Sequence, residues 1–236
     1  MKIRNFFAAA ITLLSLGMFV ACNSDEEYDQ TFTRSNHFMK PNETEKQLKN
    51  IYDSKIIHFS KNHYYLLCDS EKAAKMGIND SIYDSLQEEI VKTNEMIEEI
   101  ITNLSSQGYD NIKITDCTYD DSETDLKNLE RLVPPDEPQM PHGVLTAPNN
   151  SPVCTSIYAP YNQVGVKANC YANASLFAFH AIITTYAGSN AFVASKMGNG
   201  ELKVKIAMAN TTIGFQYQTT DSNGGICSWK GVKSLK

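Results

Sequence analysis

Cysteine and histidine are the residue types in this sequence that are best suited to catalysis or metal binding. The chain contains six cysteines and five histidines. A cysteine thiolate can bind a metal, attack a carbonyl carbon or form a disulfide. No two cysteines form a CxxC motif, and no cysteine–histidine spacing matches a zinc site. The sequence also lacks the GxSxG, HExxH and phosphate-binding glycine motifs of other enzyme classes. We therefore expect no metal and no cofactor.

The segment around Cys170 is the one candidate for nucleophilic catalysis. It reads YNQVGVKANCYANASLFAFHAIITTYAG, with Gln163 upstream of Cys170 and Tyr171-Ala172 directly after it. This pattern resembles the nucleophile region of papain-like cysteine peptidases. The resemblance implies that Cys170 begins a helix, whose dipole and a neighbouring histidine stabilise the thiolate, and that Gln163 stabilises the oxyanion.

The histidines are not arranged as in the papain-like family. None follows His180, and on a helix His180 would lie about 15 Å from Cys170, beyond hydrogen-bond reach. A base would then have to come from upstream in a permuted order, from His37, His58, His63 or His142. The alternative is that residues 172–187 form a buried helix or strand with His180 in the core, and periodicity does not distinguish the two. We favour a non-enzymatic protein, with a cysteine hydrolase using Cys170 as the alternative.

The N-terminal segment predicts export. Lys2 and Arg4 precede an apolar stretch, as in a signal peptide over residues 1–21. Residues 19–22, FVAC, resemble the lipobox of bacterial lipoproteins. The resemblance implies cleavage before Cys22 and attachment of lipid to its thiol and new amino group. Several acyl chains hold a protein stably on a bilayer, at about 0.8 kcal/mol for each buried CH₂ group.

An acidic run follows the lipobox. Residues 24–29 read SDEEYD, and Asn23 is not the aspartate that favours inner-membrane retention. This run is similar to the export signal of surface lipoproteins in some Gram-negative bacteria. The resemblance implies a lipid anchor in the cell outer membrane, on either the surface or the periplasmic face. The alternative role of residues 22–43 is a solvated, flexible tether.

Five cysteines remain once Cys22 carries lipid. We expect Cys68 and Cys117 to lie in the core. An exported chain can form disulfides, and the pool for a bridge consists of Cys154, Cys170 and Cys227. The sequence does not select a pair, and the odd count leaves at least one thiol unpaired within the chain.

The strongest local pattern predicts a long amphipathic helix over residues 81–106. Asp80 would cap its start and Gly108 its end. Apolar residues recur on one face at spacings of three and four, namely Ile82, Leu86, Ile90, Ile97, Ile100 and Leu104. We expect this face to pack in the core, with a partner-binding groove helix as the alternative. Two apolar runs that flank Lys61-Asn62 predict a hairpin before the helix.

The order of elements predicts an α+β fold. Residues 44–133 would be mainly helical, including a short strand over 110–118 and a helix near Ser122. Residues 134–153 contain six prolines and are predicted to be a linker. Residues 154–236 alternate apolar and polar side chains, which is typical of antiparallel strands. In that part a turn at Asn199-Gly200 would join residues 190–197 to the next strand, another would lie at 221–225, and Trp229 would plug the core.

Charge is unevenly distributed along the chain. Residues 154–236 carry seven lysines against Glu201 and Asp221, a net charge of +5, which leaves −11 for residues 1–153 within the total of −6. We expect the two halves to attract each other; a preference of the C-terminal half for anionic partners is the alternative. No nucleic-acid motif is present. The resulting hypothesis is a lipid-anchored binding or interaction module of the cell envelope, with an unidentified protein or glycan ligand.

Overall fold

The computed structural model describes residues 43–119, 140–185 and 189–235, which belong to a compact unit spanning 41–236. Strands make up 43% and helices 25% of the structure, arranged around three sheets. The predicted α+β class with a mainly helical N-terminal part is therefore wrong, because the fold is mostly β. None of the helices in the described ranges has the length and apolar character needed to cross a membrane.

The described elements are three helices and eleven strands. The helices are α2 (Glu43–Asp53), α3 (Ser70–Lys75) and α4 (Asp80–Ser106). The N-terminal strands are β1 (Ile57–Ser60), β2 (His63–Leu66) and β3 (Asn111–Asp116). The remaining strands are β4 (His142–Ala147), β5 (Val153–Ala159), β6 (Gly165–Ala172), β7 (Phe179–Thr185), β8 (Asn190–Met197), β9 (Gly200–Lys205), β10 (Thr211–Thr219) and β11 (Gly225–Val232).

Helix α4 occupies the range in which the apolar periodicity predicted a helix. Its N-cap is Asn79 rather than Asp80, because the Asn79 side chain accepts a hydrogen bond from the Ile82 amide at 2.9 Å. Gly108 follows the helix with a φ of +91°, as expected of a C-terminal glycine. The predicted apolar face is buried except at Ile82, which is partly buried, and Leu86 is fully excluded from solvent. The predicted hairpin is also present, as β1 and β2.

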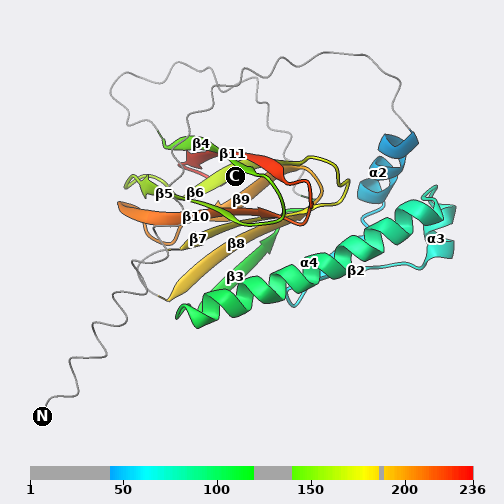
Figure 1. The fold of residues 1–236 in the computed structure, drawn as a ribbon, viewed down its shortest axis with the longest axis horizontal. Helices are drawn as coiled ribbons and strands as arrows, with labels where there is room; N and C mark the ends of the chain where they lie inside the picture. Colours follow the sequence, from blue (N-terminus) through cyan, green and yellow to red (C-terminus); the bar gives the residue numbers. More distant parts are fainter. Residues whose placement is uncertain (1–42, 120–139, 186–188, 236) are drawn as a thin grey trace, which may run out of the picture. The chain divides into compact units, whose positions relative to one another are not determined.

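The unit is built in three layers (Figure 1): helix α4, a five-stranded sheet and a four-stranded sheet. The five-stranded sheet has the order β3-β8-β7-β10-β5, and the four-stranded sheet has the order β4-β11-β6-β9. Side chains alternate between the two faces of a strand. On β7, Ile183 therefore packs in the core shared with α4, whereas Ile182 packs in the core between the two sheets.

The region predicted to be a proline-rich linker contributes a strand. Residues 142–147 of the range 134–153 form β4, which pairs antiparallel with β11. In addition, β3 from the N-terminal part pairs parallel with β8. Residues on both sides of the expected linker thus share one sheet. The helix predicted near Ser122 lies outside the described residues.

Two predicted turns connect different sheets instead of neighbouring strands. Strand β8 belongs to the five-stranded sheet and β9 to the four-stranded sheet, so the expected hairpin at Asn199-Gly200 is wrong. The chain crosses at Gly198, whose φ is +92° and where a Cβ atom would overlap the Tyr52 hydroxyl. Strands β10 and β11 are separated in the same way. Residues 172–187, for which periodicity did not distinguish a helix from a strand, contain strand β7.

Candidate functional site

Cys170 lies in the four-stranded sheet of the unit, not at a helix terminus. It belongs to strand β6, is fully buried, and stands opposite Cys227 of β11. Burial, followed by a hydrogen bond to Cys227, raises the pKa of the Cys170 thiol well above its usual value. The helix start that the papain-like resemblance implied is therefore wrong, and the thiol is poorly suited to act as a nucleophile.

Gln163 is not close to Cys170. It precedes β6, and seven residues of extended chain span about 23 Å. Its amide group lies against Gly231 of β11 and donates a hydrogen bond to the Gly165 carbonyl at 3.2 Å. The structure does not bring the proposed nucleophile and the proposed oxyanion donor together.

His180 lies between the two sheets, on β7. Its ring stacks on Tyr217, with ring centroids 5.9 Å apart, and its Nδ1 lies 3.1 Å from the Tyr217 hydroxyl. Burial, and secondarily the Lys196 ammonium, lower the pKa of His180 to about 4, although Asn199 and Asp221 oppose the shift. Burial also raises the pKa of Tyr217. At neutral pH His180 and Tyr217 are therefore uncharged, and His180 is the core histidine of the alternative interpretation.

Lys196 serves to join elements inside the unit. Its side chain is buried, and Nζ donates hydrogen bonds to the carbonyls of Cys117 and Thr118, each at 3.1 Å. A buried ammonium needs such acceptors, because an unpaired charge in the interior is strongly destabilising. These contacts hold the segment after β3 against β8.

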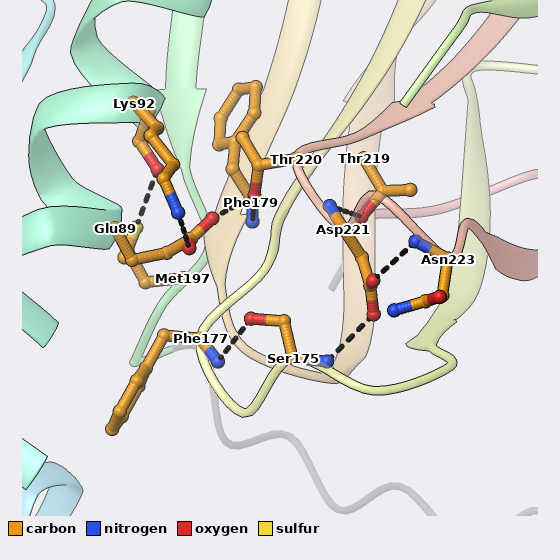
Figure 2. Close-up of polar contacts among 11 residues, drawn as sticks. Glu89, Lys92, Ser175, Phe177, Phe179, Met197, Thr219, Thr220, Asp221 and Asn223 are labelled. Atoms are coloured by element: carbon orange, nitrogen blue, oxygen red, sulfur yellow. Dashed lines mark hydrogen bonds and ion pairs between the residues drawn. The ribbon is translucent and has the colours of Figure 1, made fainter. Parts of the chain in front are cut away.

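A second polar cluster fastens the loops at one end of the sheets to helix α4 (Figure 2). Thr220 accepts a hydrogen bond from the Phe179 amide at 2.8 Å, and its hydroxyl donates to the buried carboxylate of Glu89. Lys92, one helical turn further on α4, lies 3.5 Å from the same carboxylate. Asp221 follows in the loop and accepts hydrogen bonds from the backbone amides of Ala174, Ser175 and Asn223 at 2.7, 2.7 and 2.8 Å.

The carboxylates of this cluster, those of Glu89 and Asp221, both accept hydrogen bonds from other residues of the chain. Burial alone would raise the pKa of Asp221, but the backbone hydrogen bonds, led by that of Ser175, lower it overall. Asp221 is therefore held in its charged form as a structural acceptor. These hydrogen bonds fix the conformation of the loop that contains Asp221, and they do not indicate catalysis.

The outer face of the four-stranded sheet carries a line of three lysines and one histidine. In the strand register Lys230 of β11 lies between His142 of β4 and Lys167 of β6, and Lys167 in turn is the partner of Lys203 on β9. We call these four residues the basic row. Glu201 lies at 3.8 Å from Lys167 and at 3.7 Å from Lys203, which keeps the two cations close together. Neighbouring strands are about 4.8 Å apart, so the three lysines of the row follow one another at that interval.

The basic row lies on the side of the unit that faces away from α4. Helix α4 packs on the five-stranded sheet, and Figure 1 shows the four-stranded sheet beyond it. Lys230 and Lys205 are exposed, as are Val144 and Tyr171, whose exposed fractions are 63% and 49%. An exposed face that combines cations with an aromatic and an aliphatic side chain is suited to binding rather than to catalysis.

The sequence contained only part of the signal for this surface. The alternation in ELKVK predicted that Lys203 and Lys205 share one outward face. It did not indicate that Lys167 and Lys230 align with them, because strand order depends on contacts between distant segments. The sequence suggests His142 only as a base in a permuted order, whereas the structure places it at one end of the basic row.

Within the described ranges, no group of three or more histidine, cysteine or acidic side chains is arranged to hold a metal ion. A comparison with known protein families, curated proteins and solved structures finds no match for this chain.

Proposed function

We propose that this chain is a lipid-anchored binding protein of the cell envelope, which uses the outer face of its four-stranded sheet to bind an acidic glycan. The observation that carries this proposal is the basic row, in which lysines from three adjacent strands lie in register with a histidine of the fourth. Cys22 would attach the protein to the outer membrane, and residues 23–42 would connect that anchor to the folded unit. The proposal leaves the membrane face open.

The spacing of the basic row favours a ligand with repeated negative charges. Lysines about 4.8 Å apart can contact several carboxylate or sulfate groups of one polymer chain, and each such contact is weak by itself. Lys230 and Lys205 are the exposed ones, whereas Lys167 and Lys203 are partly covered and lie beside Glu201. Multiple contacts on one polymer add up without the need for a deep pocket. The exposed ring of Tyr171, at one side of the row, offers an apolar surface to the faces of sugar rings.

The same residues argue against a protein as the main ligand. The centres of protein–protein interfaces are depleted in lysine, because its charge must be desolvated. Here lysines occupy the two central strands of the sheet, as Lys167 on β6 and Lys230 on β11. A hydrated polyanion can neutralise them without full desolvation.

The proposal is tested with the chain from residue 23 onward, which retains the whole compact unit and lacks the lipid anchor. Binding to a uronic-acid polymer and to a neutral polymer of the same length is measured by calorimetry at low and at physiological salt. We expect binding to the acidic polymer alone, and weaker binding as salt rises, because salt screens exposed charges.

The variant Lys205→Glu/Lys230→Glu reverses two exposed charges on the binding face. Each reversal should cost about 0.5–1 kcal/mol, or about 5- to 30-fold in affinity for the pair. The control Lys49→Glu/Lys72→Glu changes the net charge equally at exposed positions on α2 and α3. Equal weakening by the two variants, binding to the neutral polymer, or binding only to vesicles of anionic phospholipid would each contradict the proposal.

The anchor is tested separately, by mass spectrometry of the N-terminal peptide from membranes. A mature N-terminus at Cys22 with added acyl chains supports the lipid attachment. A chain that retains residues 1–21, or an unmodified Cys22, would contradict it without affecting the binding experiment.

A further inference from the structure

Cys170 and Cys227 form a facing pair inside the four-stranded sheet. They are Cα partners in the antiparallel register of β6 and β11, the two central strands of that sheet. Both side chains are fully buried on its inner face, and both are thiols in this structure. Residues directly opposite each other in an antiparallel pair have Cα atoms about 4.5–5.5 Å apart. That separation lies within the range of about 4.4–6.8 Å found in disulfides.

The other described cysteines are less suitably placed for a bridge to either partner. Cys117 packs in the same core, with its sulfur 3.9 Å from the Lys203 carbonyl of β9, but it lies outside the β6–β11 register that makes Cys170 and Cys227 direct partners. Cys154 is on β5, with its sulfur 3.8 Å from the Gln216 side chain of the same sheet. Cys68 packs in the core beneath α4, on the far side of the five-stranded sheet. The register thus selects one pair from the pool of Cys154, Cys170 and Cys227.

We propose that Cys170 and Cys227 are a modification site, at which a thiol–disulfide exchange reaction joins strands β6 and β11 covalently. In the first step a thiolate of the pair attacks a low-molecular-weight or protein disulfide, forms a mixed disulfide and releases one thiol of the oxidant. In the second step the partner cysteine attacks the mixed disulfide and releases the other thiol. The two protein thiols lose two electrons in total, and their two protons end on the two thiols released from the oxidant.

The burial of the pair determines when this reaction takes place. The sulfurs are excluded from solvent, and burial raises the pKa of Cys170, so the folded chain presents little reactive thiolate. Oxidation therefore occurs while the chain folds, before the two sheets close over the pair. Once formed, the bond is shielded from reductants by the same packing.

The bridge would reinforce the surface described above. Residues alternate on β6 and β11, so the cysteines point into the core while Lys167 and Lys230 point outward from the same two strands. The closed loop runs from residue 170 to residue 227 and includes β7, β8, β9 and β10. Closing a loop of this length removes much of the freedom of the unfolded chain. The inference does not depend on glycan binding or on lipidation.

Peptide mapping tests the pair directly. The chain from residue 23 onward is refolded at pH 8 in a mixture of reduced and oxidised glutathione, alkylated and digested with trypsin. Each remaining cysteine falls in a different tryptic peptide, with Cys170 in residues 168–196 and Cys227 in residues 206–230. We expect these two peptides to be linked. The link should persist in Cys117→Ser and disappear in both Cys170→Ser and Cys227→Ser.

Three results would overturn the inference. Both peptides could be fully alkylated after oxidative refolding, the peptide with Cys170 could be linked to residues 114–127, which contain Cys117, or the link could form equally fast in the folded and the unfolded chain. An unfolding measurement adds an independent readout. The denaturant midpoint of the wild-type protein should fall when a reductant is present during refolding, whereas the midpoint of Cys227→Ser should not respond.

Discussion

The buried histidine makes the stability of this protein depend on pH in a way that can be calculated. In the unfolded chain His180 takes up a proton near pH 6.5, whereas in the folded protein it does so only near pH 4. Between these values unfolding is accompanied by proton uptake, so the free energy of unfolding decreases as the pH falls. The shift of about 2.5 pKa units corresponds to roughly 3 kcal/mol in full, of which about 2 kcal/mol is lost between pH 7 and pH 5.

Urea denaturation at pH 7 and pH 5 measures this loss in the wild-type protein and in His180→Gln. The variant removes the titrating group and leaves an amide that can bond to the Tyr217 hydroxyl. It should be less stable at pH 7, yet its stability should change by about 2 kcal/mol less than that of the wild type between the two pH values.

The control variant is His63→Gln, which removes a histidine whose pKa is shifted in the opposite direction. His63 is half-exposed and its pKa is raised, first by its bond to the Lys61 carbonyl and then by Glu98. Its contribution is present below pH 6.5 and is lost as the pH rises, which is opposite in sign to that of His180. If His180→Gln and the wild type lose the same free energy between pH 7 and pH 5, the buried, neutral state assigned to His180 is refuted.

Two further predictions concern the loops between the sheets. Gly198→Ala should destabilise the protein by about 2 kcal/mol more than Gly108→Ala in thermal unfolding, because both glycines have positive φ but only a Cβ atom at 198 would overlap a neighbouring side chain. Asp221→Asn should cost about 1–3 kcal/mol at pH 7, since three amides share the carboxylate. Because the pKa of Asp221 is lowered, this stabilisation is present above pH 3.8 and is lost as the pH falls through the folded value, so the stabilities of the variant and the wild type should converge as urea titrations are taken to lower pH.

Local elements could be predicted where a few neighbouring residues determine them. The apolar residues of α4 recur at helical spacing, and burial of most of that face, including Ile97 and Leu104, stabilises the helix. The hairpin of β1 and β2 turns at Lys61 and Asn62, both with positive φ, a conformation that asparagine tolerates well. In both cases the residues that determine the element lie within a few positions of one another along the chain, so a local pattern is enough to predict it.

The two-sheet arrangement could not be read from the same patterns. Asn199-Gly200 is a favourable hairpin turn, and a local rule therefore pairs the strands on its two sides. The structure separates them because β8 is paired with β3 and β7, which leaves no free edge for β9. Tertiary contacts formed by residues 111–116, far earlier in the chain, thus decide the role of a turn at residue 199.

The candidate surface and the cysteine pair depend on one and the same register. A slip of one residue between β6 and β11 would turn every side chain of one strand to the opposite face. Lys230 would then be buried, and Cys227 would point outward and away from Cys170. The cysteine link therefore reports on the register that also builds the basic row, without any ligand. If the link forms but charge reversal at Lys230 leaves glycan binding unchanged, the register is right and the ligand assignment is wrong.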